Sequence, residues 1–263
     1  MHWSCTTPRR STSRSEVGDS RTHTAEQGEP ARTPVRPTSG APTPGPLPAA
    51  VLWDMDGTLL DTEPYWIAEE HALVESFGGR WSMEHAHNLV GNPLLVSAEY
   101  IRANSPVTLP PEQIVHRLQA GVIDRLAEQV PWRPGALELL SGLRTAGVPC
   151  AMVTMSWRAM VDVVVAALPA GSFEVLITGD EVEHGKPDPE PYLRAAAALG
   201  VPVTDCVAIE DSVTGVASAL ASGARTIAVP HVVAVPPRTG LTVLDTLAGV
   251  APRDLLPLTS ASS

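Results

Sequence analysis

Between residues 134 and 229 the chain alternates helical and strand-like stretches, with prolines and glycines at the boundaries between them. Strands that alternate with helices form a parallel sheet that helices cover on both faces. We expect strands at residues 49–53, 148–154, 173–178, 206–210 and 225–229, and helices at residues 134–147, 156–168, 189–200 and 213–222. This pattern predicts an α/β fold built on a doubly wound parallel sheet.

The segment between residues 64 and 131 contains no convincing strand pattern. Helical character is found at residues 65–77, 93–103 and 114–126, the last with an apolar residue at every fourth position. We therefore expect an all-helical cap domain at residues 64–131, inserted into a core domain made of residues 49–63 and 132–250. Because the insertion begins beside the end of the first strand, it can act as a lid.

Both ends of the chain are expected to lie outside the core. Residues 1–48 are rich in Pro, Ser, Thr, Gly and Arg and have no apolar period, which predicts a disordered tail. A start codon assigned too far upstream explains this composition equally well. The paired Arg9 and Arg10 are not followed by the apolar stretch that an export signal requires. We expect residues 230–263 to form a loop and a strap, with residues 251–263 as a terminal tail.

Charge and composition exclude several classes of protein. Residues 1–48 contain six arginines and four acidic residues, a net charge of +2. Because the whole chain has a net charge of −11, residues 49–263 have a net charge of −13. A domain this acidic repels nucleic acid, and no apolar run approaches the roughly 18 residues of a membrane-spanning helix. Cys5, Cys150 and Cys206 are far apart in the sequence, which indicates buried thiols in a reducing cytoplasm and neither disulfides nor a zinc site.

Polar residues cluster where the expected strands end. Ligands of open parallel sheets bind beyond the carboxyl ends of the strands, so we expect these residues to share one rim of the sheet. They are Asp54 and Asp56, Thr154 and Ser156, Lys186, and Glu210, Asp211 and Ser212. Lys186 is the only lysine of the chain, which contains seventeen arginines.

The four carboxylates of this rim would repel one another strongly. Two like charges about 4 Å apart cost on the order of 4 kcal/mol at an effective dielectric constant of 20. One lysine neutralises one of these charges, so a cation is expected as well. Because the available ligands are oxygens, the set suits a hard cation, and Mg²⁺ fits best. An ammonium, a magnesium ion and two hydroxyls together predict a phosphotransferase or phosphatase centre.

Four motifs of the chain, in this order, resemble those of the haloacid dehalogenase superfamily. They are Asp-Met-Asp-Gly-Thr at residues 54–58, Val-Thr at 153–154, Gly-Lys-Pro-Asp-Pro at 185–189 and Ile-Glu-Asp-Ser at 209–212. The resemblance covers residues 49–230. The helical insertion after the first motif is similar to the branch that contains sugar-phosphate and phosphoglycolate phosphatases and β-phosphoglucomutase.

The resemblance implies a role for each motif residue. Asp54 would attack phosphorus and form an aspartyl-phosphate, and Asp56 would protonate the departing alcohol and then activate water. Thr154 and Lys186 would hold the phosphoryl oxygens. Asp211 would bind Mg²⁺ together with Asp54 and the backbone carbonyl of Asp56, and Glu210 is a weaker candidate ligand.

Within this branch the residues favour hydrolysis over isomerisation. Dehalogenases generally lack the second aspartate, so Asp56 argues against cleavage of a carbon–halogen bond. The mutase has a histidine twelve residues after the nucleophile, where this chain has Trp66, and residues 90–95 lack basic side chains. We expect a cytoplasmic, Mg²⁺-dependent phosphatase for a small monoester, such as a sugar phosphate or a phosphoglycolate-like compound. A phosphosugar mutase and a catalytically inactive binding or regulatory domain are the alternatives, and the sequence leaves monomer or homodimer open.

Candidates for contacts with the rest of the substrate are less well defined by the sequence. Ser156 and Asn92 are substrate-binding candidates, and Glu63, which lies beside Asp61 at the entrance to the insertion, is either such a contact or a structural hydrogen-bonding group. Tyr65, Trp66 and Arg133 are further nominees. His85 and His87 have no third metal ligand nearby, so we expect them in a surface loop.

Overall fold

The computed structural model describes residues 45–260. Most of the tail expected at residues 1–48 lies outside the described residues. Its last four residues belong to the folded part, because Pro48 is buried and Leu47 packs against the hydrophobic core. None of the helices between residues 45 and 260 combines the length and the apolar character needed to cross a bilayer.

The centre of the described part is a parallel sheet of six strands in the order β3-β2-β1-β4-β5-β6. The strands are β1 (Ala50–Trp53), β2 (Cys150–Val153), β3 (Val175–Ile177), β4 (Cys206–Glu210), β5 (Arg225–Ala228) and β6 (Leu241–Val243). The order reverses between β1 and β4, which makes the sheet doubly wound and opens a crevice beyond the ends of these two strands. The predicted α/β fold is confirmed.

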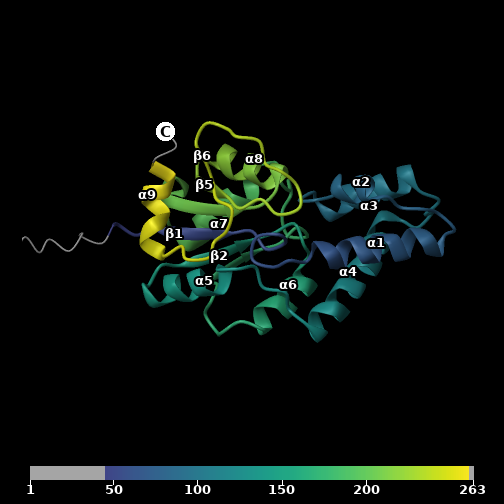
Figure 1. Cartoon of the computed structure of the whole chain (residues 1–263), viewed down its shortest axis with the longest axis horizontal. Helices are drawn as coiled ribbons and strands as arrows, with labels where there is room; N and C mark the ends of the chain where they lie inside the picture. Colours follow the sequence, from purple (N-terminus) through teal and green to yellow (C-terminus); the bar gives the residue numbers. More distant parts are fainter. Residues whose placement is uncertain (1–44, 261–263) are drawn as a thin grey trace, which may run out of the picture. The chain divides into compact units, whose positions relative to one another are not determined.

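Helices cover both faces of the sheet (Figure 1). They are α5 (Ala136–Thr145), α6 (Arg158–Ala166), α7 (Glu190–Leu199) and α8 (Val213–Ser222), with a short 3-10 helix η1 (Val203–Asp205) before β4. Side chains alternate along β1, so Ala50 and Leu52 pack against α7 and α8, whereas Val51 and Trp53 share a cluster with α5 and α6. The buried β1 is thereby held with its carboxyl end at the crevice.

The segment between β1 and α5 is helical, as expected, and the structure places no strand between residues 64 and 131. Its helices are α1 (Glu63–Ser76), α2 (Met83–His87), α3 (Leu94–Asn104) and α4 (Pro111–Glu128), which lie together beyond the end of the sheet (Figure 1). Helix α2 was not predicted. The expectation that His85 and His87 lie in a loop is therefore wrong: they are in α2, where the ring of His85 stacks on Trp81 at 4.7 Å between centroids.

The two connections between this helical segment and the sheet run side by side. Leu60 and Trp132 form an antiparallel bridge. The N–H of Asp61 donates to the carbonyl of Pro131 at 2.7 Å, and the N–H of Arg133 donates to the carbonyl of Leu59 at 3.0 Å. The chain therefore enters and leaves the segment at one hydrogen-bonded crossing, and the domain boundaries at residues 64 and 131 stay a prediction.

The end of the described chain is more ordered than the loop and strap expected from the sequence. Strand β6 extends the sheet, and residues 252–260 form η2 (Pro252–Asp254) and α9 (Leu255–Ser260). Leu255 is fully buried in the main hydrophobic cluster. These elements have three to six residues each and α9 contains a proline, so they are too short to give a periodic apolar pattern.

Candidate active site

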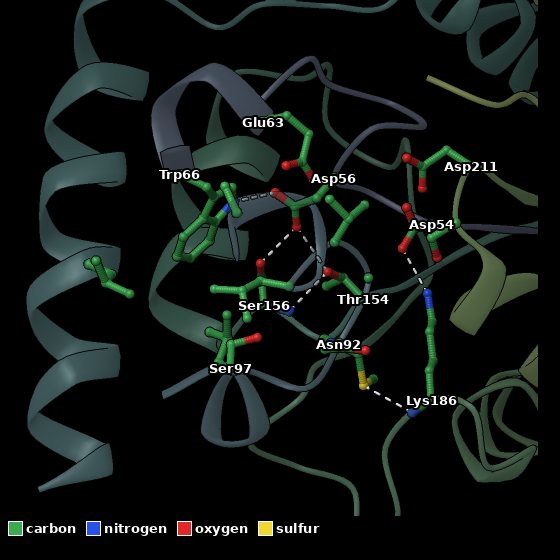
Figure 2. Close-up of a pocket in the computed structure, with 18 of the residues that line it drawn as sticks. Asp54, Asp56, Glu63, Trp66, Asn92, Ser97, Thr154, Ser156, Lys186 and Asp211 are labelled. Atoms are coloured by element: carbon green, nitrogen blue, oxygen red, sulfur yellow. Dashed lines mark hydrogen bonds and ion pairs between the residues drawn. The ribbon is translucent and has the colours of Figure 1, made fainter. Parts of the chain in front are cut away.

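The polar residues expected on one rim do lie close together there. Figure 2 shows Asp54 beside Lys186, and Thr154 and Ser156 beside Asp56. The Lys186 ammonium donates to Asp54 Oδ1 at 2.7 Å, to Glu210 Oε1 at 2.6 Å and to the carbonyl of Val153 at 2.8 Å. Only 2% of Lys186 is exposed. Burial alone would lower its pKa, but the ion pairs with Asp54 and Glu210 outweigh burial and raise the pKa above its ordinary value. The lysine therefore stays charged.

A third buried acid lies close to the two that bind this lysine: carboxylate oxygens of Asp54, Glu210 and Asp211 lie within 4.8 Å of one another. Burial raises the pKa of Asp54 to about 7, with Glu210 adding to the shift and Lys186 opposing it. Burial also raises the pKa of Asp211 well above its ordinary value, and the charges of Asp54 and Glu210 add to this. Once ionised, the three acids outnumber the single ammonium, and a divalent cation would relieve the repulsion that contributes to these raised pKa values.

The donor set fits such a cation. The second oxygen of Asp54, Oδ2, is buried and has no hydrogen-bond partner within residues 45–260. A Cβ atom at Gly57 would lie 2.0 Å from Asp211 Oδ2, and Gly57 has a φ of +83°. The glycine of the first motif therefore lets the chain turn and leaves room for the Asp211 carboxylate.

The carboxylate of Asp56 lies apart from this acidic cluster. It accepts hydrogen bonds from the hydroxyls of Thr62 at 2.6 Å and Ser156 at 2.7 Å, from Thr154 at 3.3 Å and from the indole N–H of Trp66 at 3.1 Å. Four donors on one carboxylate fix its orientation, and Figure 2 shows three of them, Trp66, Thr154 and Ser156, around Asp56. A metal-ligand role for Asp56 therefore falls to its backbone carbonyl, because its side chain is already satisfied.

A cavity opens between this rim and the helical segment. Asp54, Asp56, Thr154, Ser156, Lys186, Asp211 and Ser212 line one side of it. The other side is lined by Glu63, Trp66 and Glu70 of α1, by Ala86 of α2, by residues 89–92, by Leu94 and Ser97 of α3 and by Val115 and Leu118 of α4. The predicted contacts Glu63, Trp66 and Asn92 therefore do face the cavity. Sequence reasoning missed Glu70, Ser97 and the hydrogen bond from Trp66 to Asp56.

Two nominees lie elsewhere. The hydroxyl of Tyr65 donates to the carbonyl of Gln129 at 3.3 Å, because Tyr65 follows Glu63 and precedes Trp66 on α1 and so points away from their face. The guanidinium of Arg133 contacts the ring of His231, which in turn lies 2.7 Å from Asp61. Expecting Tyr65 and Arg133 in the site was wrong, since both serve the junction with the helical segment.

A short loop of the helical segment closes the cavity against the core. The Thr214 hydroxyl donates to the side-chain carbonyl of Asn92 at 3.4 Å, and the Asn92 amide donates to the backbone carbonyl of Asn88 at 2.8 Å. A Cβ atom at Gly91 would lie 2.4 Å from Ser212 Oγ. The loop thus touches the start of α8, directly after the acidic cluster.

Comparison with known proteins gives a consistent picture. Residues 48–223 match the family model described as haloacid dehalogenase-like hydrolase. The chain is 34% identical over 204 residues to the protein CbbY of Rhodobacter capsulatus, an alignment that covers 69% of this chain and 85% of that protein. It is 32% identical over 184 residues to hexitol phosphatase B of Escherichia coli (strain K12), covering 69% and 83%. The crystal structure of CbbY from Rhodobacter sphaeroides with phosphate is similar with a TM-score of 0.71 and 28% identity, over 80% of this chain and all of that one.

Proposed function

Since the chain belongs to the haloacid dehalogenase-like hydrolase family, we propose that it is a Mg²⁺-dependent phosphatase that hydrolyses a small phosphate monoester through an aspartyl-phosphate. The observation that carries this proposal is the buried cluster of Asp54, Glu210, Asp211 and Lys186 at the carboxyl ends of β1 and β4. A cation-binding acidic group beside a buried ammonium suits the charge that develops on a transferred phosphoryl group.

In this proposal Asp54 is the nucleophile. Its Oδ1 is held by Lys186 at 2.7 Å, and its Oδ2 has no partner in the described residues. One of the two oxygens would attack phosphorus while the other faces the cation. As the new bond forms, the bond between phosphorus and the ester oxygen breaks, and its electron pair leaves with the alcohol oxygen. The covalent intermediate divides one difficult displacement into two easier steps.

Asp56 is proposed to move the protons. It gives a proton to the departing alcohol and then takes one from the water whose oxygen attacks phosphorus, so that the bond to Asp54 breaks and inorganic phosphate is released. Such acid–base work contributes roughly 10²- to 10⁴-fold. The four hydrogen bonds on its carboxylate support this role, because they hold it beside the cavity. Thr154 and Lys186 are proposed to bind the phosphoryl oxygens, with Ser156 beside them.

Asp54, Asp211 and the backbone carbonyl of Asp56 would hold Mg²⁺, which when bound supplies positive charge to the phosphoryl oxygens. Glu210 is more plausible as the group that holds the lysine, because its Oε1 already accepts from Lys186 at 2.6 Å and from the Tyr192 hydroxyl at 2.5 Å. Residues 64–131 are proposed to act as the cap that covers the substrate. Buried, unpaired Cys150 and Cys206 support a cytoplasmic location.

Among substrates, the relatives favour phosphorylated sugars and polyols. A hexitol phosphatase is among the similar proteins, as is a phosphorylated carbohydrates phosphatase of Thermotoga maritima. A phosphosugar mutase is less well supported, because the chain has Trp66 where the mutase has a histidine and because Lys186 is the single basic side chain that lines the cavity among the described residues. A mutase must bind a bisphosphate intermediate.

Release of inorganic phosphate tests the proposal. Purified protein should release phosphate from p-nitrophenyl phosphate and from a hexitol phosphate with Mg²⁺, and EDTA should stop the release. Asp54→Asn should abolish turnover. A mutase would convert a sugar 1-phosphate to the 6-phosphate without net phosphate release, and an inactive binding domain would give neither reaction. Either result, or wild-type turnover by Asp54→Asn, would refute the proposal.

A further inference from the structure

The cavity wall formed by the helical segment carries two acidic side chains, both on α1. Glu63, Trp66 and Glu70 are three and four positions apart on α1 and therefore share one face of the helix, and all three line the cavity. The rest of this wall is largely apolar and includes Leu89, Leu94, Val115 and Leu118. Both glutamates are outside the acidic cluster proposed to hold Mg²⁺, so the reaction described above leaves them unexplained.

Glu63 lacks a partner in spite of its burial. Only 7% of it is exposed, and its carboxyl group makes no hydrogen bond or ion pair within residues 45–260. Figure 2 shows it beside Asp56. Burial raises its pKa to about 8, and the charge of Asp56 adds to the shift. The carboxyl oxygens of Glu63 are not among the fully buried atoms that lack a partner, so they open onto the cavity, where a hydrogen-bond donor on a ligand can reach them.

Glu70 extends the acidic wall and is held in place. It is 5% exposed, and its Oε2 accepts a hydrogen bond from the indole N–H of Trp81 at 2.9 Å. Trp81 is itself fixed by stacking on His85 and by an edge contact with Tyr100. The other carboxyl oxygen of Glu70 accepts no hydrogen bond from the described residues, which leaves it available to the cavity. Trp81 is therefore a positioning residue for Glu70.

No basic side chain among the described residues that line the cavity is available to pair with Glu63 and Glu70. Of the described side chains that line the cavity, Lys186 alone is basic, and it is committed to Asp54 and Glu210. Burial raises the pKa of Glu63 to about 8 and that of Glu70 to about 7, so both carboxyl groups are ionised only above a pH of about 8. A second phosphate or a carboxylate on the substrate would then lie against two negative charges, with no free basic side chain on the described part of the cavity wall. Like charges placed against each other in this way cost several kcal/mol.

We propose that Glu63 and Glu70 determine specificity: they admit monophosphates whose leaving group carries hydroxyl or ammonium donors, and they reject substrates with a second anionic group. The inference rests on the proposed function, which supplies the position of the phosphoryl group. It excludes sugar bisphosphates and phosphoglycolate, and it assigns to Glu70 the contact with the end of the substrate farthest from phosphorus.

Wild-type selectivity is the first test. Glucose 6-phosphate, glucose 1,6-bisphosphate, sorbitol 6-phosphate, phosphoethanolamine and phosphoglycolate are compared by kcat/KM, with p-nitrophenyl phosphate as reference. Above pH 8, where both glutamates are ionised, the two compounds with a second anionic group, glucose 1,6-bisphosphate and phosphoglycolate, should have kcat/KM at least about 100-fold below the best compound without one, as expected for a like-charge penalty of several kcal/mol. Comparable values would overturn the inference, whereas no release from any compound, the reference included, would instead refute the proposed function.

Variants then test the two glutamates. Glu70→Gln keeps the shape of the side chain and removes its charge. The ratio of kcat/KM for glucose 6-phosphate to kcat/KM for glucose 1,6-bisphosphate should therefore fall about tenfold. Glu75→Gln on the exposed side of the same helix is the matched control and should leave the ratio unchanged. Trp81→Phe should raise KM for sorbitol 6-phosphate several-fold while kcat changes little, as expected of a positioning role. An unchanged ratio in folded Glu70→Gln would overturn the assignment, and if that variant does not fold, the wild-type ratio decides.

Discussion

Replacing Asp54 by asparagine should stabilise the metal-free protein while it abolishes catalysis. Asparagine resembles the protonated carboxyl group, which the buried site prefers. The pKa of Asp54 is raised from 3.8 to about 7, mainly by burial, so between these values the native state binds a proton that the unfolded state has lost. Stability of the wild type therefore falls as the pH rises from about 4 to about 7. At 1.36 kcal/mol for each pH unit, the charge costs about 2 kcal/mol at pH 5 and about 4 kcal/mol at pH 8.

Urea denaturation in EDTA measures this cost. Midpoints and slopes of wild type and Asp54→Asn are compared at pH 3.5, 5 and 8, and the free energies of unfolding follow by linear extrapolation. The advantage of the variant should be near zero at pH 3.5 and should grow with pH. Asp245→Asn, an exposed acid after β6, serves as control and should show no such trend. Added Mg²⁺ should stabilise the wild type and remove the advantage of the variant, because the ion binds the native state.

A variant that is less stable than the wild type at pH 8 would refute this reasoning. So would an effect of equal size at all three pH values, because the effect would then arise from packing and not from a buried charge. Greater stability together with lost activity would instead show that the acidic cluster is kept for function at the expense of the fold.

Three further substitutions probe the site. Lys186→Met should lower kcat/KM by at least about 100-fold, because it removes the positive charge beside the nucleophile. Phosphate-release assays measure this change, and a smaller decrease would contradict the role proposed for Lys186. Trp66→Phe keeps the ring and loses one hydrogen bond to the proposed acid, worth about 1 kcal/mol, so kcat should fall about fivefold in steady-state assays. Gly91→Ala should raise KM, because its Cβ meets the first turn of α8, whereas Gly78→Ala, with a similar φ of +76° and nothing within 4 Å, should leave KM unchanged despite the same backbone strain.

The sequence predicted which polar residues lie together at the edge of the sheet, because this grouping depends on little else than strand direction. Once β1, β2 and β4 are parallel neighbours, the residues that follow them must share an edge, and Asp54, Thr154 and Asp211 do. Lys186 was predicted from its uniqueness and its position after β3. The same local patterns gave β4 and α8 with the bounds that the structure has.

What the sequence did not predict depends on contacts between distant segments. In the sequence Glu70 looks like any polar residue of a helix. Its fixed position depends on the hydrogen bond from Trp81, eleven positions later, which only the folded chain brings close to it. Side chains of α1 cannot be assigned to the cavity without the position of α4, and this explains why Tyr65 was nominated beside Trp66. Strand β6 is stabilised by its pairing with β5, and α9 by the burial of Leu255, so neither has a strong pattern of its own.

The paired connections at residues 59–61 and 131–133 have a consequence for how the chain could open. Because the two connections are hydrogen-bonded to each other, the helical segment has a single pivot and not two independent tethers. We therefore expect the segment to move as one unit. Trp66 is carried on the moving side, while Asp56 stays with β1. Any swing that separates them breaks the indole hydrogen bond at 3.1 Å, so the carboxylate is fully oriented only after the substrate has been enclosed.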